Sequence, residues 1–498
     1  MKRVIAVFLV CVLLCGFAGI HTSALDVNYG EGELELLIYG DIPSQVELEN
    51  VPTPAPARGA RAMAAATVFD VIYNGLLNMD ASINIASFGI SRYNIGPYIG
   101  VVLNNHPELF AVNRTYRYSY YTNDNIADLL FTYTMTKPQY TTALATYNAE
   151  INRIVSGIQP TFTDLEKVVY VHDYLASNFE YDQSLTIYDA YQFLTLKTGV
   201  CQSYMLTFMG IMNRLGITTM PAYSDTDNHT WNLVYLDGSW YHLDVTFDDP
   251  TSDRTGIAKH GYLLISSAKL ATDNKHRNWY VDFTNSTPTC SSTKYQAGYV
   301  WLNAATSLTW ANGYWYYIQY GSSYSSFCRP TSAFTSGTTL KNLYDTWNVN
   351  QVPQQGYWGG YFSGIFTYGT RVCYNTPLSL AYYDTAGNTY GTLKTFSSSK
   401  DIYGCTYNGR GTVTVDFKTS PNVTVKGLSS FTMPGLGDVD GNGSTDAQEI
   451  VLTRKYLLNG AGNFNWGALD VTGGVGLDIH DLVRLKKYAA GLIPSLAS

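Results

Sequence analysis

The sequence has little that would direct it to a nucleic acid or hold it in a membrane. It carries 31 Lys and Arg against 39 Asp and Glu, a net charge of −8, and no basic stripe, so its composition gives no support for nucleic-acid binding. Beyond residue 24 it has no apolar run long enough to span a membrane. It also lacks the CxxC spacing of zinc sites and a convincing pair of glycosidase carboxylates.

The N-terminus has the features of a signal peptide. Two basic residues precede an almost wholly apolar run over residues 5–20, and small side chains up to Ala24 offer a cleavage site. Residues 1–24 are therefore predicted to direct secretion and to be removed, which gives an extracellular protein without a membrane span. A membrane anchor would need a longer apolar run, and a lipoprotein at Cys15 would need a smaller residue than Leu14.

Five cysteines remain after the expected cleavage. Cys201 stands apart from the even set formed by Cys290, Cys328, Cys373 and Cys405. In an exported protein such a set allows two disulfides, with three connectivities open. Cys201 is then the candidate free thiol.

Length and composition predict a multidomain globular protein. A chain of 498 residues exceeds what one hydrophobic core holds, and 46% apolar with 14% charged residues is typical of folded domains. The expected fold class is an α+β core, an all-β tyrosine-rich domain and a small all-α calcium-binding domain. The expected segments are an N-terminal segment and linker over 25–61, an α/β region over 62–160, a catalytic domain over 161–285, a β-rich domain over 286–432 and a C-terminal module over 435–498.

Apolar periodicity predicts the main elements before the catalytic residues. The spacing favours helices over 66–79 and 140–158 and an extended stretch over 115–121. A stronger helix is expected to begin with Asp164 as its N-cap. Its apolar stripe consists of Val168, Val169, His172, Leu175 and Phe179.

Short aromatic strands dominate residues 286–432. They recur at 314–318, 361–368, 380–383 and 412–415, with turn signals such as Asn312-Gly313 between them. An all-β domain is expected, either a sandwich or propeller-like blades. Its aromatic side chains could stack on sugars, although half-buried strands favour aromatic residues in any case.

The region around Cys201 predicts a reactive thiol at the start of a helix. Gly199 precedes the cysteine, and apolar residues at helical spacing follow it up to a stop at Gly216. The unpaired N–H groups and the dipole of a helix start favour a thiolate, and the backbone N–H of Cys201 can donate to an oxyanion. A structural cysteine would more naturally lie within the apolar stripe.

A histidine and an aspartate follow on a predicted β-hairpin. The turn signal Asp237-Gly238 joins a strand that begins at His229 to a return strand over 239–247. That turn pairs Trp231 with Asp244, which makes His229 and Asp244 diagonal neighbours on one face of the hairpin. A slip of one residue would move Asp244 to the opposite face.

These three residues are the thiol, imidazole and carboxylate of a nucleophilic cysteine site. The motifs around them are Gly-Val-Cys-Gln-Ser-Tyr at 199–204, His-Thr-Trp-Asn at 229–232 and Trp-Tyr-His-Leu-Asp-Val-Thr-Phe-Asp-Asp-Pro at 240–250. Over roughly residues 161–270 they resemble the transglutaminase-like superfamily, whose core is related to papain-like cysteine proteases. Ser203 stands where that family commonly has Gly or Ala.

The resemblance implies acyl transfer through a thioester. Cys201 would be the nucleophile, His229 the base and acid, and Asp244 the orienting carboxylate. The substrate would be a protein or peptide amide. Attack by water would make the protein a peptidase or amidase, and attack by an amine would make it a cross-linker.

Near the C-terminus the chain has the pattern of a calcium-binding loop. Oxygen-bearing residues fall at loop positions 1, 3, 5, 7, 9 and 12, with Gly443 at position 6 for the sharp turn. A helix follows. The predicted ligands are Asp438, Asp440, Asn442, Ser444 through its carbonyl, Asp446 and Glu449.

The pattern repeats 32 residues later with a weaker loop. Asp470, Asp478 and Asp481 are retained, whereas Thr472 and Gly474 replace better ligands, so calcium is expected chiefly in the first loop. The tandem loop and helix over 435–498 resembles a type I dockerin. That resemblance implies calcium-dependent docking onto a cohesin of a cellulosome scaffoldin. Its implied partner-binding residues are Ala447, Gln448, Arg454, Lys455, Ile479, His480, Lys486 and Lys487.

Three functions are compatible with these features. The first is a secreted cysteine acyltransferase or peptidase attached to a cellulosome, which the complete triad favours. The second is a non-catalytic component that uses the tyrosine-rich domain to hold a plant cell-wall polymer. The third is a glycoside hydrolase, the kind of enzyme to which dockerins are usually attached.

Overall fold

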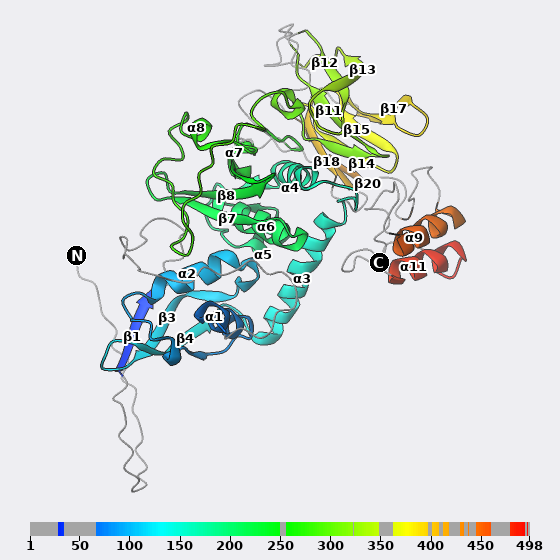
Figure 1. The fold of residues 1–498 in the computed structure, drawn as a ribbon. Coiled ribbons are helices and arrows are strands. Elements are labelled where there is room, and N and C mark those ends of the chain that lie inside the picture. The colour runs from blue at the N-terminus through cyan, green and yellow to red at the C-terminus, as the bar shows by residue number, and fades with distance from the viewer. Residues whose placement is uncertain are drawn as a thin grey trace, which may run out of the picture.

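The computed structural model describes the chain from the N-terminal α/β region to the C-terminal helices, with gaps (Figure 1). The described residues are 28–33, 66–249, 255–321, 323–347, 362–396, 401–407, 412–417, 429–432, 437, 445–459, 479–493 and 496. The expected signal peptide over 1–24 and the proline-rich stretch at 50–61 lie outside them. Among these residues no helix is both long and apolar enough to cross a membrane.

The N-terminal region is a four-stranded sheet covered by helices, with a core of its own. The antiparallel strands are ordered β1-β3-β4-β2, and the buried side chains of Ile72, Ile99 and Leu129 join helices to sheet. The helix expected over 66–79 and the extended stretch over 115–121 are confirmed to within three residues. The elements are β1 (Asn28–Glu33), α1 (Val68–Leu77), β2 (Ser82–Asn84), α2 (Ile95–Asn105), β3 (Val112–Tyr120) and β4 (Ile126–Tyr133).

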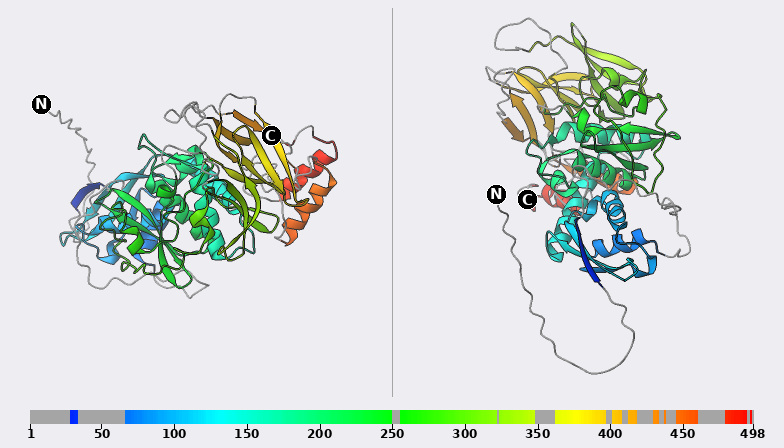
Figure 2. Two further views of the ribbon diagram at one scale, coloured as in Figure 1. Left: turned by 90° about the horizontal axis from the view of Figure 1, so that it is seen from above. Right: turned by 90° about the vertical axis from the view of Figure 1, so that its left-hand side faces the viewer.

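Helix α6 (Cys201–Leu215) lies at the centre of the molecule, between other helices and the sheet β7-β8-β9 (Figures 1 and 2). It is buried along nearly its whole length, and Gly216 ends it in a left-handed conformation with φ 72°, as predicted. The elements around it are α3 (Lys137–Val155), α4 (Asp164–Asn178), β5 (Glu180–Tyr181), α5 (Ala190–Leu196), β6 (Thr198–Gly199), β7 (Thr219–Ser224), β8 (His229–Leu236), β9 (Ser239–Leu243), α7 (Val245–Asp248) and α8 (Ser267–Leu270).

The cap of α4 differs from the prediction by one residue. Thr163, not Asp164, is the N-cap: its hydroxyl accepts from the N–H of Glu166 at 3.2 Å. The Glu166 carboxylate in turn accepts from the N–H of Thr163 at 2.8 Å. This reciprocal capping box satisfies two donors at once, which a cap at Asp164 would not do. The predicted apolar stripe of the helix is buried as expected.

The hairpin has the predicted register but a shorter return strand. Asp237 and Gly238 both have positive φ, 49° and 79°, as a two-residue hairpin turn requires. Asn232 pairs with Leu243 and the pairing continues to the turn. The strand expected over 239–247 ends at Leu243, because the next four residues after Asp244 form α7.

The β-rich region consists of three antiparallel meanders that follow one another along the chain. Their strand orders are β10-β11-β12-β13, β14-β15-β16-β17 and β18-β19-β20, and β14 contacts both β10 and β18. This topology matches the blade-like alternative. The strands are β10 (Thr309–Ala311), β11 (Tyr314–Gln319), β12 (Ser325–Pro330), β13 (Gly337–Leu343), β14 (Ile365–Tyr368), β15 (Arg371–Asn375), β16 (Ser379–Asp384), β17 (Thr389–Thr395), β18 (Ile402–Tyr407), β19 (Thr412–Phe417) and β20 (Ser429–Thr432).

The first meander shares its core with the helices around α6. Trp301 and Trp315 belong to the same buried cluster as Val168 and Leu175 of α4. The indole N–H of Trp315 donates to Glu166 at 2.9 Å. Since this core crosses residue 285, the β-rich region is joined to the helical layer by packing as well as by the chain.

The two disulfides that the sequence allows are not formed among the described residues. Cys290, Cys328, Cys373 and Cys405 are all buried free thiols. Cys290 and Cys328 lie in two different clusters, and only Cys373 and Cys405 share one. Burial raises the pKa of Cys290 to about 11 and that of Cys373 to about 12, which keeps these thiols protonated and unreactive.

The C-terminal module shows two helices that pack together. They are α9 (Ala447–Asn459) and α11 (Ile479–Ala489), close to the helices expected after each loop. Buried Leu485 of α11 forms a small apolar cluster with Leu496, and Ile450 of α9 packs against it together with Tyr488.

The turn before Cys201 leaves no room for a side chain at Gly199. A Cβ there would lie 2.7 Å from Cδ2 of Phe193, and closer still to the Ser203 hydroxyl. We therefore expect Gly199→Ala to lower the free energy of unfolding by about 1–3 kcal/mol through overpacking, measured by denaturant unfolding. The double variant Gly199→Ala with Ser203→Ala should recover part of the loss.

Gly100 is the matched control for this substitution. It lies in helix α2, where a Cβ would meet no neighbouring atom within 4 Å, and Ala is the better helix former by roughly 1 kcal/mol. Gly100→Ala should leave stability unchanged or raise it. Equal losses at both positions would contradict the steric explanation.

Candidate active site

Cys201 is the first residue of the buried helix α6. Val200 before it is extended and makes no side-chain cap, so no side-chain oxygen of the N-cap residue competes for the first N–H groups of the helix. The Cys201 side chain lies at the edge of the core, with the residue 5% exposed. The position therefore gives the sulfur the electropositive setting predicted for a nucleophile.

His229, the first residue of β8, connects the thiol to a carboxylate. Its Nε2 donates to Oδ2 of Asp244 at 2.6 Å, and Cys201 is close enough to interact electrostatically with the same imidazole. The ring is held between Trp231, stacked at 5.6 Å, and Phe247 at 4.9 Å. The three residues expected to form the triad are thus brought into one chain of contacts.

The charge state of His229 follows from these contacts. Burial alone would lower its pKa, but the charge of Asp244 and the hydrogen bonds to Asp244 and Cys201 outweigh burial and raise the pKa to about 10. Burial would raise the pKa of Asp244, but the charges and hydrogen bonds of His229 and His276 hold it well below its usual range. His229 is therefore an imidazolium at neutral pH, as a thiolate–imidazolium pair requires.

Asp244 reaches His229 in a different way from the one predicted. It is not a strand residue but the N-cap of α7, where Oδ1 accepts from the N–H of Phe247 at 3.2 Å. Its own N–H donates to the carbonyl of Tyr262 at 3.2 Å. The cap leaves Oδ2 free to face His229, so the hairpin register brings the two residues close and the cap sets the orientation.

A second histidine, which sequence reasoning missed, also holds Asp244. Nε2 of His276 lies 2.9 Å from Oδ2 of Asp244, and its Nδ1 lies 3.0 Å from Oδ2 of Asp273. The hydroxyl of Tyr262 donates to the same Asp273 oxygen at 2.5 Å. His276 lies 32 residues beyond Asp244 in no recognisable motif, so no local signal identified it.

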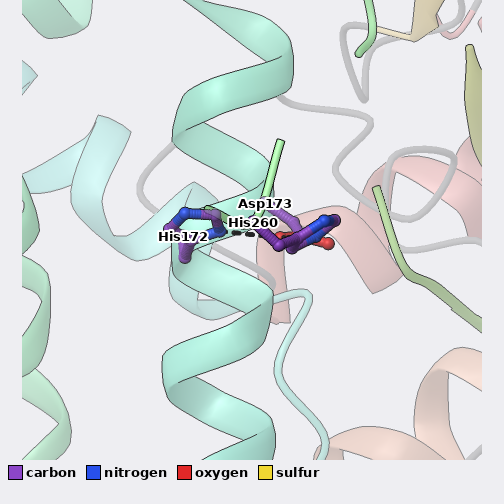
Figure 3. Close-up of side chains that lie close together, drawn as sticks. All are labelled: His172, Asp173 and His260. Atoms are coloured by element: carbon purple, nitrogen blue, oxygen red, sulfur yellow. Dashed lines mark hydrogen bonds and ion pairs between the residues drawn. The ribbon is translucent and has the colours of Figure 1, made fainter. Parts of the chain in front are cut away.

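Another buried ion-pair cluster lies between α4 and the loop after α7 (Figure 3). Nδ1 of His172 lies 2.8 Å from Asp173, and its Nε2 lies 3.0 Å from Asp248. His260 donates from Nε2 to the same Asp173 oxygen at 3.0 Å. Sequence periodicity placed His172 only in an apolar stripe, because its partners Asp248 and His260 lie far away in the chain.

Within the described residues, two histidine and aspartate groups have the spacing of metal ligands, one around Asp244 and the one in Figure 3. A metal-bound histidine offers a nitrogen lone pair and donates only its other N–H. Both ring nitrogens of His172 and of His276 instead face carboxylates. The two groups therefore have the hydrogen-bonding pattern of ion-pair networks.

The predicted calcium ligands fall only partly within the described residues. The carboxylates of Glu449 and Asp481 are buried at the starts of α9 and α11. Asp446 donates its N–H to Glu449 at 2.6 Å and accepts from the N–H of Gln448 at 2.7 Å. Outside the described residues lie Asp438, Asp440, Asn442, Ser444, Asp470 and Asp478.

The predicted partner-binding residues lie on the two C-terminal helices. Ile479 and His480 are the first residues of α11. On α9 and α11 the exposed members are Ala447, Gln448, Arg454, Lys455, Lys486 and Lys487.

Comparison with known proteins identifies the central layer. Residues 151–245 match the model of the transglutaminase-like superfamily. This segment is therefore similar to a transglutaminase-like core. It carries α4, α5, α6 and the β7-β8-β9 sheet, and therefore Cys201, His229 and Asp244.

Two curated proteins of known name are similar to part of this chain. The chain is 25% identical over 162 residues to the kyphoscoliosis peptidases of Mus musculus and Homo sapiens, covering 27% of this chain. The match spans about a quarter (24%) of the length of these relatives. Solved structures with 15% identity include a TGase, with 33% of this chain and 50% of that chain covered at a TM-score of 0.20. The match to a candidate cysteine protease from Cytophaga hutchinsonii covers 36% of this chain and 75% of that chain, at a TM-score of 0.19.

The buried imidazolium of His172 makes stability depend on pH. Burial alone would lower its pKa, but hydrogen bonds to Asp173 and Asp248 and their charges raise it from 6.5 to about 9. A histidine whose pKa is higher in the folded state stabilises that state fully below pH 6.5. This stabilisation is lost as the pH rises through 9. We expect the melting temperature to fall over this interval, and to fall less in His172→Gln, by calorimetry.

The His172→Gln protein should also have a lower melting temperature than the wild type at pH 6. Part of the dependence of the melting temperature on pH will remain in this variant, because the pKa of His229 is raised as well. His106→Gln is the control, because His106 pairs with Glu108 at 3.2 Å in the partly exposed N-terminal region. If the melting temperature fell equally with pH in His172→Gln and in the wild type, His172 would not be the source of the pH dependence.

Proposed function

We propose that this protein is a secreted cysteine enzyme of transglutaminase-like type, attached to a cellulosome through a calcium-binding dockerin. The observation that carries the enzymatic part is the 2.6 Å contact between His229 and Asp244, with Cys201 at a helix start and close enough to influence the same imidazole. The superfamily match over residues 151–245 supports the same chemistry.

The reaction follows from the charge state of the pair. The Cys201 thiolate attacks an amide carbonyl, the C–S bond forms, and the carbonyl electron pair moves onto oxygen, where the Cys201 N–H can donate. As the intermediate collapses, the C–N bond breaks and the leaving amine takes the proton from His229. A thioester and a neutral imidazole remain.

Deacylation returns the site to its first state. Water or a second amine attacks the thioester while His229 removes its proton, and the C–S bond breaks to release the Cys201 thiolate. Asp244 holds the imidazole in the same orientation in both half-reactions. The relatives carry the name peptidase, so hydrolysis is the outcome that we propose, with a protein or peptide as substrate.

The docking function rests on the C-terminal module. Asp438, Asp440, Asn442, Asp446 and Glu449 would hold Ca²⁺ in the first loop, because carboxylate and amide oxygens are the ligands that this ion prefers. The buried Glu449 carboxylate at the start of α9 fits this role. The exposed basic pairs on α9 and α11 would face a cohesin in the extracellular space.

One observation favours a second role, a carbohydrate-binding surface on the β-rich region. Tyr314, Tyr320, Tyr324 and Tyr344 are 41–66% exposed around the first meander. Exposed aromatic rings can stack on sugars, so a plant cell-wall polymer is the proposed ligand. This role would operate beside the cysteine chemistry or in place of it.

The enzymatic proposal is tested with a peptide library in the presence and absence of an added primary amine, read by mass spectrometry. We expect hydrolysed peptides with the wild type, because water is the proposed acceptor. Cys201→Ala should abolish them and also the labelling by a thiol-reactive probe, because burial raises the pKa of each of the other four thiols.

The matched control for that experiment is Cys290→Ala, which removes a buried thiol outside the triad. It should retain both product formation and labelling. An unlabelled Cys201, or peptide turnover that persists in Cys201→Ala, would overturn the cysteine mechanism. If the added amine were found linked to the peptides, the reaction would be transamidation and the proposed hydrolysis would be wrong.

Calcium binding is tested on the full chain by titration calorimetry after chelation. We expect one strong site, which Asp438→Ala abolishes because it removes the first ligand of the better loop. Asp470→Ala, the equivalent change in the weaker loop, should leave the strong site intact. Two equal sites would contradict the difference predicted between the loops.

A further inference from the structure

The carboxylate of Asp244 is shared by two imidazoles. Its Oδ2 accepts from His229 at 2.6 Å and from His276 at 2.9 Å. The rings of the two histidines lie edge to face, with centroids 5.2 Å apart. His276 is fully buried, packed against Trp231 and Phe247.

Both ring nitrogens of His276 face carboxylates. Nε2 lies against Asp244 and Nδ1 against Asp273, and the pKa values of both carboxyl groups are lowered. The imidazole is therefore held from both sides by carboxylate oxygens. Asp273 also accepts from the Lys275 N–H at 2.8 Å, which fixes the outer end of the arrangement.

We propose that His276 is a positioning residue for the candidate active site: it holds Asp244 by a second hydrogen bond, so that Asp244 in turn keeps His229 directed at Cys201. This inference rests on the proposed cysteine chemistry. The Asp244 carboxylate then has a donor for each direction it faces, Phe247 on Oδ1 and the two histidines on Oδ2. Without His276 the carboxylate keeps its charge but loses one of its restraints.

The titratable groups around this network come from every element packed against it. Cys201 lies on α6, His229 on β8 and His242 on β9. His242 is neutral, because burial and the nearby His276 charge lower its pKa to about 3. The remaining groups that face the network are Asp248 of α7, Tyr262 and Asp273. Of these groups only His229 also donates to Asp244, and it already does so beside His276, so no described titratable group is left to replace His276.

The test measures the rate at which iodoacetamide alkylates Cys201 in the full chain between pH 5 and 9, because this readout needs no known substrate. His276→Ala should slow alkylation at pH 7 by about tenfold or more, the loss expected for one hydrogen bond to a charged group. His276→Gln can still donate one N–H to Asp244 and should recover most of the rate. Asp273→Asn, which keeps the imidazole, should show a smaller loss in the same direction.

His106→Gln is the matched control, and calorimetry verifies that each variant is folded. If His276→Ala does not fold, His276→Gln and Asp273→Asn still test the idea through the pH profile of alkylation. Normal rates and profiles in all His276 and Asp273 variants, with alkylation lost in His229→Ala, would overturn this inference alone. An unreactive wild-type Cys201 would overturn the proposed function as well.

Discussion

The buried carboxylate of Asp244 is the constraint on which the candidate site depends. Moving a carboxylate out of water costs several kcal/mol unless it is paired and hydrogen-bonded, and Asp244 is 1% exposed. Its partners come from three places: α7 through the N–H of Phe247, β8 through His229, and the loop after α8 through His276. These elements must therefore be in position before the charge can be buried, and the catalytic geometry follows from meeting that requirement.

The His172 cluster extends this constraint to the rest of the molecule. Asp248 ends the helix that Asp244 begins, and it accepts from His172 of α4 and from the N–H of Tyr262 at 3.0 Å. Asp173 on α4 accepts in addition from the N–H of Leu308 at 2.5 Å, at the entrance to the first β meander. The core helices, the candidate site and the β-rich region are thus joined by buried charges as well as by apolar packing.

Local signals in the sequence predicted the parts of this structure that depend on nearby residues. The helix from Cys201 to its stop at Gly216 and the register set by Asp237-Gly238 are confirmed, because apolar spacing and turn residues determine them within a few positions. The capping role of Asp244 was not predicted. The residues after Leu243 continue the strand-like pattern, and the sequence does not show that the chain turns into a helix at Asp244. His276 and the free buried cysteines depend on contacts across tens of residues, for which one sequence carries no local pattern.

The proposed mechanism gives a reason for Cys201 to lie at the start of a helix. In the network around Asp244, the two carboxylates of Asp244 and Asp273 lie against the two histidines His229 and His276. A thiolate at Cys201, as proposed, adds a further negative charge at the edge of the core. The N–H groups and dipole of α6 offset it, a stabilisation that would be absent one turn further along the helix. A cysteine within the apolar face of α6 would therefore remain a protonated thiol, as burial keeps the thiols of Cys290 and Cys373.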